Sequence, residues 1–311
     1  MIRYLGIIFL LSLTIKSHSE DCRIKVLGYS SLLGKGSLGE WVQAEWNKRA
    51  HECSVEFISA KEFSGIWGTL KKSIQKKDKN IIDVVWGISD LQYQEAEKLG
   101  WLKDGQLFDF SPFSIVVDKN KFKDADKIIS WNDLAKVFKN ELIIQDPRMS
   151  NTGLGWLRAI YEFNLLKPEF NTQIVKKVFP SWSSSYEAFL SGLGTGVWTY
   201  LSSVAYHRCE EKKENYVALN LIEGYPVQRE FVALSKNTLF ERNAKNFMNF
   251  LLSAQVQEKI PTLNWMFPGS QSARVKMPQC FVDSSNYKTI ESKTFPTMKL
   301  LEEWAERWSL L

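Results

Sequence analysis

Small polar side chains stand where a predicted strand gives way to a helix. The apolar strand Leu142–Gln145 is followed by Ser150, Asn151 and Thr152, and a helix is expected to begin near Gly153. Free backbone N–H groups and the positive end of the helix dipole favour a phosphate or carboxylate at such a position. The same residue types also cap helices, and taken alone this segment favours simple capping by Ser150 or Asn151.

Four aromatic side chains occupy positions where loops or strand ends are expected. They are Trp182, Tyr200, Tyr206 and Trp265. Each one alone is better explained as a core residue, because large rings bury extensive apolar area. Together they could form a box around a flat or cationic ring, since a desolvated cation over an indole face gains about 2 kcal/mol. The 12 tryptophans of the chain are a high number and agree with such a role.

The loop after the first predicted strand, Ile24–Tyr29, is rich in serine and glycine. It contains Ser30 and Ser31, followed by Gly34 and Gly36. The spacing of a P-loop is absent, because no Gly-x4-Gly-Lys-Ser/Thr run occurs here. Small hydroxyl side chains beside glycines can hold an anion, but a plain turn is the more common use.

Metal binding and nucleophilic catalysis find little support in the residue types. The chain has three histidines, one of them near the N-terminus, and four cysteines without a Cys-x-x-Cys pair. We therefore expect no metal site and no cofactor. His51 and His207 are far apart in the sequence, and no Ser–His or Cys–His arrangement is visible, so we expect no catalytic residues.

The cysteines suggest disulfide bonds. Cys22 precedes the first predicted strand, and Cys53 precedes the second, Val55–Ser59. If these strands are parallel neighbours, the two sulfur atoms meet at one edge of the sheet, so we expect a Cys22–Cys53 bond. A Cys209–Cys280 bond follows only by elimination.

The first residues follow the order of a secretory signal peptide. Arg3 precedes the apolar run Leu5–Ile15, and small residues follow up to Ser19. The apolar run is shorter than the roughly 20 residues that a permanent membrane-spanning helix needs. The residues just before Cys22 do not fit a lipoprotein attachment site. We expect cleavage after Ser19 and a free periplasmic protein, with a membrane anchor or a buried strand as the alternatives.

Predicted strands and helices alternate along the chain. Strands are expected at Ile24–Tyr29, Val55–Ser59, Ile81–Trp86, Phe113–Val117, Leu142–Gln145 and Arg229–Leu234. Helices are expected at about Leu38–Arg49, Ser64–Gln75, Leu91–Leu99, Ser130–Phe138, Ser203–Lys212 and Ala244–Leu252. This alternation indicates right-handed crossovers and a parallel α/β sheet covered on both faces.

The length of the chain predicts two lobes, because about 290 mature residues exceed the size at which one core keeps growing. We expect a clamshell whose ligand lies where loops at the carboxyl ends of strands converge. The expected segments are a signal peptide at 1–19, a first lobe of 20–113 and 226–291, a second lobe of 114–225, and a C-terminal helix at 292–311. Leu301 and Trp304 have the spacing by which that helix would pack on the body.

Several runs together carry a family resemblance over nearly the whole mature chain. They are Gln145-Asp146-Pro147-Arg148-x-Ser150-x-x-Gly153, Trp182-Ser183-x-x-Tyr186, Tyr200-Leu201-Ser202-Ser203-x-Ala205-Tyr206-His207 and Pro261-Thr262-x-Asn264-Trp265-Met266. With these runs the sequence resembles the thiamine-binding periplasmic proteins, the substrate-binding components of thiamine ABC transporters. Asp-Pro-Arg-x-Ser also occurs in related anion- and iron-binding proteins, whereas the later runs are more specific. The resemblance implies a type II periplasmic-binding-protein clamshell.

The resemblance also implies roles for individual residues. Tyr206 and Trp265 would sandwich the aminopyrimidine ring, and Trp182 and Tyr200 would complete the cage around the thiazolium. The hydroxyethyl or phosphate end would face Ser150, Asn151, Ser202 and Ser203. Glu62 stands where the family uses an acidic residue, which can accept hydrogen bonds from the exocyclic amine. Tyr29 and Phe63 complete the expected ligand-binding set.

The first-lobe half of the expected site departs from the family pattern. Where the family has Tyr-Asp-Ser-Phe and a nearby tryptophan, this chain has Tyr29-Ser30-Ser31-Leu32. The family's Gly-x-Asp becomes Gly87-Ile88-Ser89, with Asp90 directly after it. The preference among thiamine, its monophosphate and its diphosphate therefore stays open.

The function that follows from these observations is transport. We expect an extracytoplasmic solute-binding protein of an ABC importer that closes on thiamine or a thiamine phosphate and docks, as a monomer, on an inner-membrane permease. Removal of Arg3 and Lys16 lowers the net charge from +5 to +3, too little to indicate nucleic-acid binding.

Two alternatives belong to other functional classes. A ferric-iron or other anion carrier of the same fold is one, although Tyr200 and Tyr206 are not adjacent, as the tyrosines of iron carriers generally are. The other is an exported thiamine-cleaving enzyme, which would need a nucleophilic cysteine in the cleft. None of the four cysteines lies in a predicted binding loop.

Overall fold

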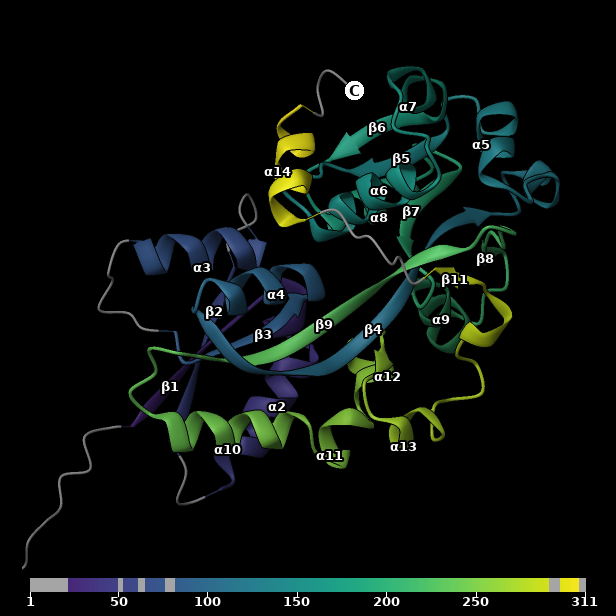
Figure 1. Cartoon of the computed structure of the whole chain (residues 1–311). Helices are drawn as coiled ribbons and strands as arrows, with labels where there is room; N and C mark the ends of the chain where they lie inside the picture. Colours follow the sequence, from purple (N-terminus) through teal and green to yellow (C-terminus); the bar gives the residue numbers. More distant parts are fainter. Residues whose placement is uncertain (1–21, 50–52, 61–64, 76–81, 291–296, 308–311) are drawn as a thin grey trace, which may run out of the picture.

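The structure is a computed structural model that describes residues 22–49, 53–60, 65–75, 82–290 and 297–307. Two groups of strands and helices lie next to each other, and two long strands run from one group into the other (Figure 1). The predicted fold class, a two-lobed α/β clamshell, is confirmed. The predicted signal peptide lies outside the described residues.

The first group is built on three parallel strands. In the order β2-β1-β3 they are β2 (Ser54–Ser59), β1 (Arg23–Gly28) and β3 (Val84–Ser89). The main helices between and after them are α2 (Leu38–Asn47), α3 (Gly65–Gln75) and α4 (Asp90–Lys98). Val84 and Trp86 of β3 pack into one core, and Val85 and Ile88 pack into another. A strand buried on both faces needs apolar residues throughout, which explains the continuous apolar run in the sequence.

Two antiparallel strands join the halves. They are β4 (Leu102–Asp118) and β9 (Tyr225–Ser235), and β9 pairs with both β3 and β4. The expectation of an entirely parallel sheet was therefore wrong at its centre. The predicted strand Phe113–Val117 is only the end of β4. The first part of that strand was missed because residues 103–107 alternate between partly exposed and exposed positions and include charged residues.

The second group repeats the parallel pattern around a core of aromatic rings. Its strands are β6 (Val175–Phe179), β5 (Leu142–Gln145) and β7 (Gly196–Tyr200), and β7 pairs with β4. Its helices are α5 (Trp131–Val137), α6 (Asn151–Glu162), α7 (Pro168–Ile174) and α8 (Trp182–Leu190). In the core, the ring of Trp198 lies 5.2 Å from those of Phe113 and Trp156. The edge strand β6 was not predicted, because none of its residues is fully buried.

The segment predicted as one helix, Ser203–Lys212, is instead divided. A short helix α9 (Ser203–Tyr206) continues into a π-helical turn η2 (His207–Glu211). Lys212 has a left-handed backbone conformation (φ 56°) that ends the turn. The strand β8 (Tyr216–Ala218) then pairs with β4.

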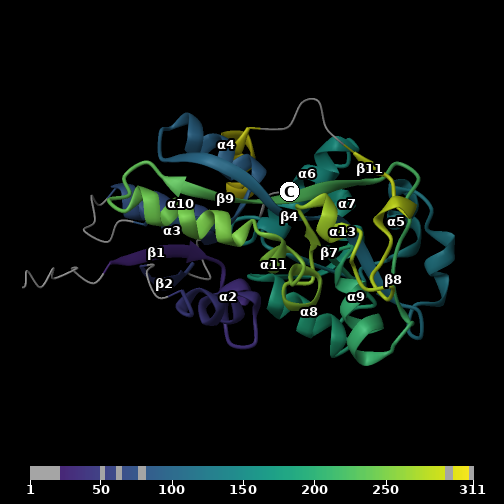
Figure 2. The ribbon, with the colours of Figure 1, turned by 90° about the horizontal axis from the view of Figure 1, so that it is seen from below.

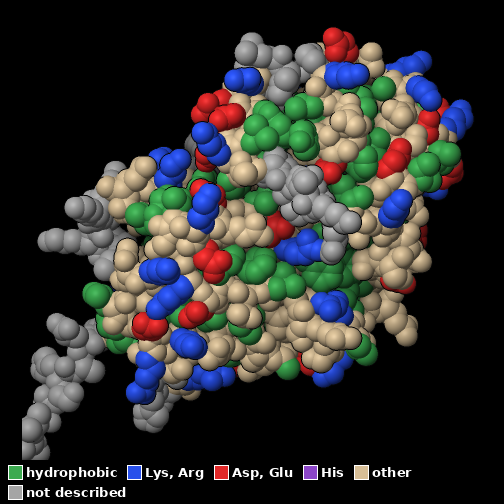
Figure 3. Space-filling view, in the orientation of Figure 1, with side chains coloured by type: hydrophobic (Ala, Val, Ile, Leu, Met, Phe, Trp, Pro, Cys, Tyr) green, Lys and Arg blue, Asp and Glu red, His purple; other side chains and the backbone are tan. Residues whose placement is uncertain are grey.

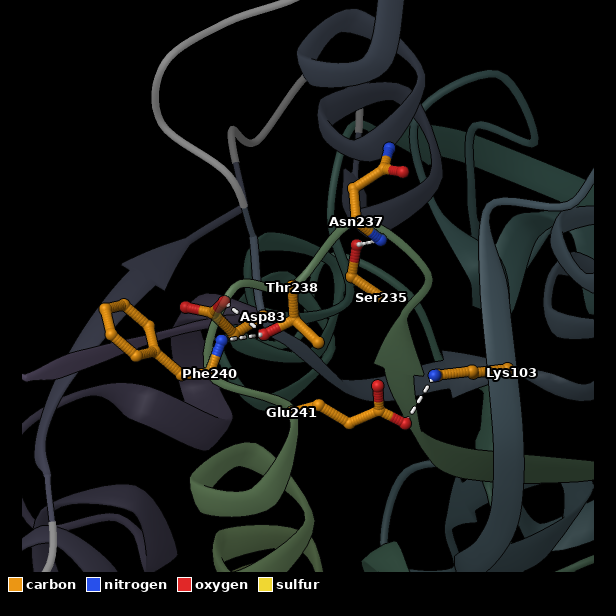
Figure 4. A network of polar contacts seen from close by, with 7 residues as sticks. All are labelled: Asp83, Lys103, Ser235, Asn237, Thr238, Phe240 and Glu241. Atoms are coloured by element: carbon orange, nitrogen blue, oxygen red, sulfur yellow. Dashed lines mark hydrogen bonds and ion pairs between the residues drawn. The ribbon is translucent and has the colours of Figure 1, made fainter.

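After β9 the chain returns to the first group. Thr238 donates a hydrogen bond of 2.6 Å to Asp83, just before β3, and accepts one from the backbone of Phe240 (Figure 4). An ion pair between Lys103 and Glu241 ties the start of the next helix to β4. The elements that follow are α10 (Glu241–Leu251), α11 (Ala254–Gln257), α12 (Ile260–Leu263), β10 (Phe267–Pro268), α13 (Gln271–Arg274) and β11 (Thr289–Ile290). Seen from below, β4 and β9 extend between the two groups (Figure 2).

The last described helix, α14 (Met298–Glu306), lies against both groups. Leu301 is buried in the core of the second group, and the ring of Trp304 lies 4.6 Å from that of Tyr161 on α6. On the other side, Trp67 of α3 donates a hydrogen bond of 2.8 Å to Glu302. This helix therefore connects the halves at a place other than β4 and β9.

Disulfide bonds join Cys22 to Cys53 and Cys209 to Cys280. The first lies beside the paired parallel strands β1 and β2, where Arg23 is opposite Ser54. Positive and negative side chains are interspersed over the face shown in Figure 3. Within the described residues, no helix combines the length and the apolar character needed to cross a membrane.

Candidate ligand-binding site

A cleft of about 460 Å³ is lined by residues of both halves. Its walls include the loop after β1, the start of α3, the N-termini of α6 and α8, the end of β7 and the segment after α12. The carboxyl ends of parallel strands and the N-termini of the helices that follow them meet at the same side of a sheet. The fold therefore brings together loops that are far apart in the sequence.

Most of the predicted ligand-binding residues lie in this cleft. Those that line it are Tyr29, Ser150, Asn151, Trp182, Tyr200, Ser203, Tyr206 and Trp265. Ser202 is not among the lining residues: its side chain is fully buried, and its hydroxyl lies 3.8 Å from the sulfur of Met266. Glu62 and Phe63 lie outside the described residues.

Trp182 is held in place on one wall of the cleft. Its ring stacks on that of Tyr186 with centroids 5.0 Å apart, and its Nε1 donates a hydrogen bond of 2.7 Å to Thr199. Thr199 is in turn 2.9 Å from the hydroxyl of Ser203. Tyr186 makes a hydrogen bond of 2.9 Å with the buried His207. A ring supported in this way presents a fixed apolar face to a ligand.

Tyr206 and Trp265 meet edge to face. Their ring centroids are 5.2 Å apart and their planes are 89° from parallel. A sandwich needs two parallel faces, so in this arrangement no ring lies between them, and one of the two would have to turn. Trp265 also has a left-handed backbone conformation (φ 53°), which is uncommon for a bulky residue and occurs most often at functional sites.

The N-terminus of α6 forms another wall. Ser150 occupies the capping position, but its side chain makes no capping hydrogen bond and lies 2.9 Å from the hydroxyl of Thr152. Asn151 accepts a hydrogen bond of 2.7 Å from Gln92 of α4, which joins the two halves. Arg148 forms an ion pair with Asp146 of the same turn. The residue types favoured simple capping of the helix by Ser150 or Asn151, but Ser150 makes no capping hydrogen bond in the structure.

The serine- and glycine-rich loop after β1 is mainly a turn. Ser30 begins the four-residue helix α1 (Ser30–Leu33), and the backbone N–H of Gly36 donates to Glu40. Ser30 and Ser31 line the cleft, whereas Gly34 and Gly36 do not.

Sequence reasoning missed an acidic group in the cleft. Glu230 of β9 lines it and is 4% exposed. It lies opposite Asp109 of β4, which is fully buried. Tyr29 donates a hydrogen bond of 2.9 Å to Glu230, and Asn264 donates one of 2.7 Å to Asp109. The available signal was a glutamate within the predicted strand Arg229–Leu234, directly before its apolar residues Phe231–Leu234.

Burial governs the ionisation of these groups. It raises the pKa of Glu230 and of Asp109, and for Asp109 the nearby Glu230 raises it further. Burial and the adjacent carboxyls raise the pKa of Tyr29 and of Tyr200, so both phenols stay neutral. Among the described residues that line the cleft, Glu230 is the only carboxylate, and none is a lysine, arginine or histidine.

Metal binding has no visible basis in the described part of the chain. No group of three or more histidine, cysteine, aspartate and glutamate side chains is placed there to hold a metal ion.

The two-lobed fold and its aromatic cleft define a class of extracellular solute-binding proteins. The profile of the family described as "Bacterial extracellular solute-binding protein" matches residues 43–260. The chain belongs to this family and, within it, to the thiamine-binding periplasmic proteins.

Three comparisons support this placement. The chain is 30% identical over 269 residues to the thiamine-binding periplasmic protein of Haemophilus influenzae, a match that covers 79% of each chain. It is 34% identical to the protein of that name from Escherichia coli over 218 residues, which are 67% of this chain but only 64% of that protein. A solved structure titled "Periplasmic thiamin binding protein" matches with a TM-score of 0.77 and 26% identity, covering 93% of this chain and 95% of that one.

Proposed function

We propose that this protein binds thiamine or a thiamine phosphate in the cleft and delivers it to the membrane permease of an ABC importer. The observation that carries this proposal is the similarity to thiamine-binding periplasmic proteins, at 25% to 35% identity and, for the longest of these matches, over 92% of the chain. The aromatic lining of the cleft supports the proposal independently, because thiamine contains two flat rings, one of them cationic.

The residues of the cleft have complementary roles in this proposal. The faces of Trp182, Tyr200 and Trp265 bind the rings by stacking and by attraction of the thiazolium cation. The N-terminus of α6, with Ser150 and Asn151, receives the hydroxyethyl or phosphate end, because a helix N-terminus favours negative charge. Ser203, which also lines the cleft, is a further proposed contact for this end, and Glu62 and Phe63 remain proposed contacts.

We further propose that the halves act as lobes, 20–113 with 226–291 and 114–225, which close on the ligand by bending of β4 and β9. The protein works as a monomer in the periplasm after removal of residues 1–19, and the closed form docks on the permease. No catalytic step is part of this function, which agrees with the names of the relatives as binding proteins.

A ferric-iron or oxyanion carrier of the same fold is the alternative. No specific observation favours it, because within the described lining of the cleft no lysine, arginine or histidine is present to hold an oxyanion. Ferric citrate is therefore included in the test below.

The test is calorimetric titration of the mature protein, freed of co-purified ligand. We expect Kd values below about 1 μM for at least one of thiamine, its monophosphate and its diphosphate, and no binding of ferric citrate. Trp265→Ala and Tyr206→Ala should each weaken binding by about tenfold or more, because each removes an aromatic wall.

Tyr161→Ala is the matched control for Tyr206→Ala. The two tyrosines have nearly equal exposure, 38% and 40%, but Tyr161 contacts α14 and not the cleft. Its replacement should leave Kd unchanged. Absence of binding of every thiamine form by folded protein would contradict the proposed function.

A further inference from the structure

We propose that the paired carboxyl groups of Glu230 and Asp109 form the counter-charge for the cationic ring of the ligand and give up a proton when that ring binds. This inference rests on the proposed function, and it assigns a specificity role to two residues on the strands that join the halves.

The geometry favours the neutral, protonated form of both carboxyl groups in the empty cleft. Glu230 and Asp109 are directly opposite in the β4–β9 register, and both are almost completely buried. Oδ1 of Asp109 receives no hydrogen bond from any donor in the described residues. Each carboxyl group lies opposite the other and away from water, so protonation of both avoids a buried unpaired charge. Two adjacent buried carboxylates cannot both be ionised at low cost.

The groups that face the pair are neutral dipoles. Tyr29 donates to Glu230 and Asn264 donates to Asp109, whereas the side-chain nitrogen of Gln228 has no hydrogen-bond partner among the described residues. Ser89 of β3 is opposite Glu230 on the other side, and the neutral Tyr200 lies close by.

The nearest charged cluster is separate from this pair. Asp90, Arg158 and Arg229 interact with one another. The hydrogen-bond donors to the carboxyl pair, Tyr29 and Asn264, are both uncharged.

The cleft offers a place for an external cation. Glu230 reaches its surface, and ring faces of Tyr200 and Trp265 also line it. Several lysine and arginine side chains of the described residues lie over aromatic rings. These rings belong to Trp41, Trp46, Phe110, Phe179 and Phe250. None of these rings lines the cleft. When the neutral pair loses one proton it carries one negative charge, which balances the single positive charge of a thiazolium. Because a buried charge is stable only when paired, cation binding and deprotonation favour each other.

The sign of the pH dependence follows from this coupling. Burial raises the pKa of both groups, so the pair is protonated at mildly acidic pH in the empty cleft. A bound cation favours the deprotonated form and lowers the apparent pKa. Affinity for thiamine should therefore rise with pH until the empty cleft has already lost the proton, and it should level off above that point.

The experiment measures proton release and affinity together. Thiamine is titrated into wild-type protein at pH 6 in two buffers of different ionisation enthalpy, phosphate and Bis-Tris. We expect release of up to one proton per thiamine bound, falling toward zero at higher pH. This measurement needs no variant, so it does not depend on the folding of a mutant.

Glu230→Gln and the double variant Asp109→Asn with Glu230→Gln test the same residues. The double variant should bind thiamine about tenfold more weakly or worse and release no proton. Both variants should bind the uncharged half of the ligand, 4-amino-5-hydroxymethyl-2-methylpyrimidine, within about twofold of wild type at pH 8. Glu258→Gln is the control, because Glu258 pairs with Lys276 outside the cleft and its replacement should change nothing.

The outcomes separate this inference from the proposed function. Tight thiamine binding without proton release, with the double variant equal to wild type, would overturn the counter-charge assignment alone. If the substitutions weaken the binding of thiamine and of the uncharged pyrimidine equally, the assignment is also overturned. The carboxyl pair would then contribute to the shape of the cleft and not to recognition of the ligand's charge. If wild-type protein binds no thiamine form, the proposed function fails and this inference fails with it.

Discussion

At the scale of single residues, a glycine sets the position of a cleft side chain. Gly87 has a left-handed backbone conformation (φ 88°) at the register shift between β3 and β9. A Cβ atom there would lie 2.5 Å from the ring of Tyr29, which is closer than non-bonded carbon atoms approach. The ring of Tyr29 can therefore lie against β3, with its hydroxyl group on Glu230, only because this residue has no side chain.

Gly87→Ala should accordingly affect both stability and binding. The strained backbone should cost about 1–3 kcal/mol of the free energy of unfolding, and the displaced Tyr29 should weaken thiamine binding. Urea unfolding and calorimetric titration measure the two effects.

Gly36→Ala is the matched control for this substitution. Gly36 has a similar φ of 75°, but a Cβ atom there would meet nothing within 4 Å. We expect a comparable loss of stability with unchanged affinity. A Gly87→Ala protein that binds as tightly as wild type would show that the position of Tyr29 does not matter.

At the scale of elements, the helix α14 completes a core that belongs mainly to the second half. Met298, Leu301 and Ala305 are buried on one face of the helix, whereas Lys299 on another face is exposed. Glu302 accepts a hydrogen bond from Trp67, which adds a contact to the first half. A periodic apolar face predicts that a helix is covered, but only the structure identifies what covers it.

Leu301→Ala should lower the free energy of unfolding by about 2–5 kcal/mol, because it leaves a cavity in a closed core. Lys299→Ala, on the exposed face, should change it by less than about 0.5 kcal/mol. Urea denaturation monitored by tryptophan fluorescence compares the two. Equal stability of both variants would mean that α14 is not packed as described.

At the scale of the whole molecule, several contacts join the halves. The strands β4 and β9 run through both, α14 contacts both, and Gln92 of α4 binds Asn151 of α6 at the cleft. Closure on a ligand therefore has to bend two paired strands while these contacts are kept or exchanged. A ligand drives such a change only as far as it binds the closed form better than the open form.

Saturating thiamine should therefore decrease the radius of gyration in small-angle X-ray scattering, because closure of the lobes makes the protein more compact. Trp265→Ala protein, at a thiamine concentration too low to saturate it, should keep the radius of the empty form. An unchanged radius at proven saturation of wild type would contradict closure by lobe movement.

Much of the architecture was accessible from the residues alone. The alternation of strands and helices, the apolar β3 and the confirmed clamshell class follow from local patterns of residue type, which reflect which faces must be buried. Trp182 and Tyr200 were singled out because rings at loop positions and strand ends could together form a box around a flat ring, and they do line one cleft.

Other features were decided only by the tertiary structure. The antiparallel centre of the sheet, the edge-to-face meeting of Tyr206 with Trp265, and the pairing of Asp109 with Glu230 depend on contacts between segments far apart in the chain. In the sequence, Asp109 and Glu230 are two ordinary acidic residues within strands. Strand register places them opposite each other, and register is set by the packing of the whole sheet, because a shift of one residue would turn every side chain to the opposite face.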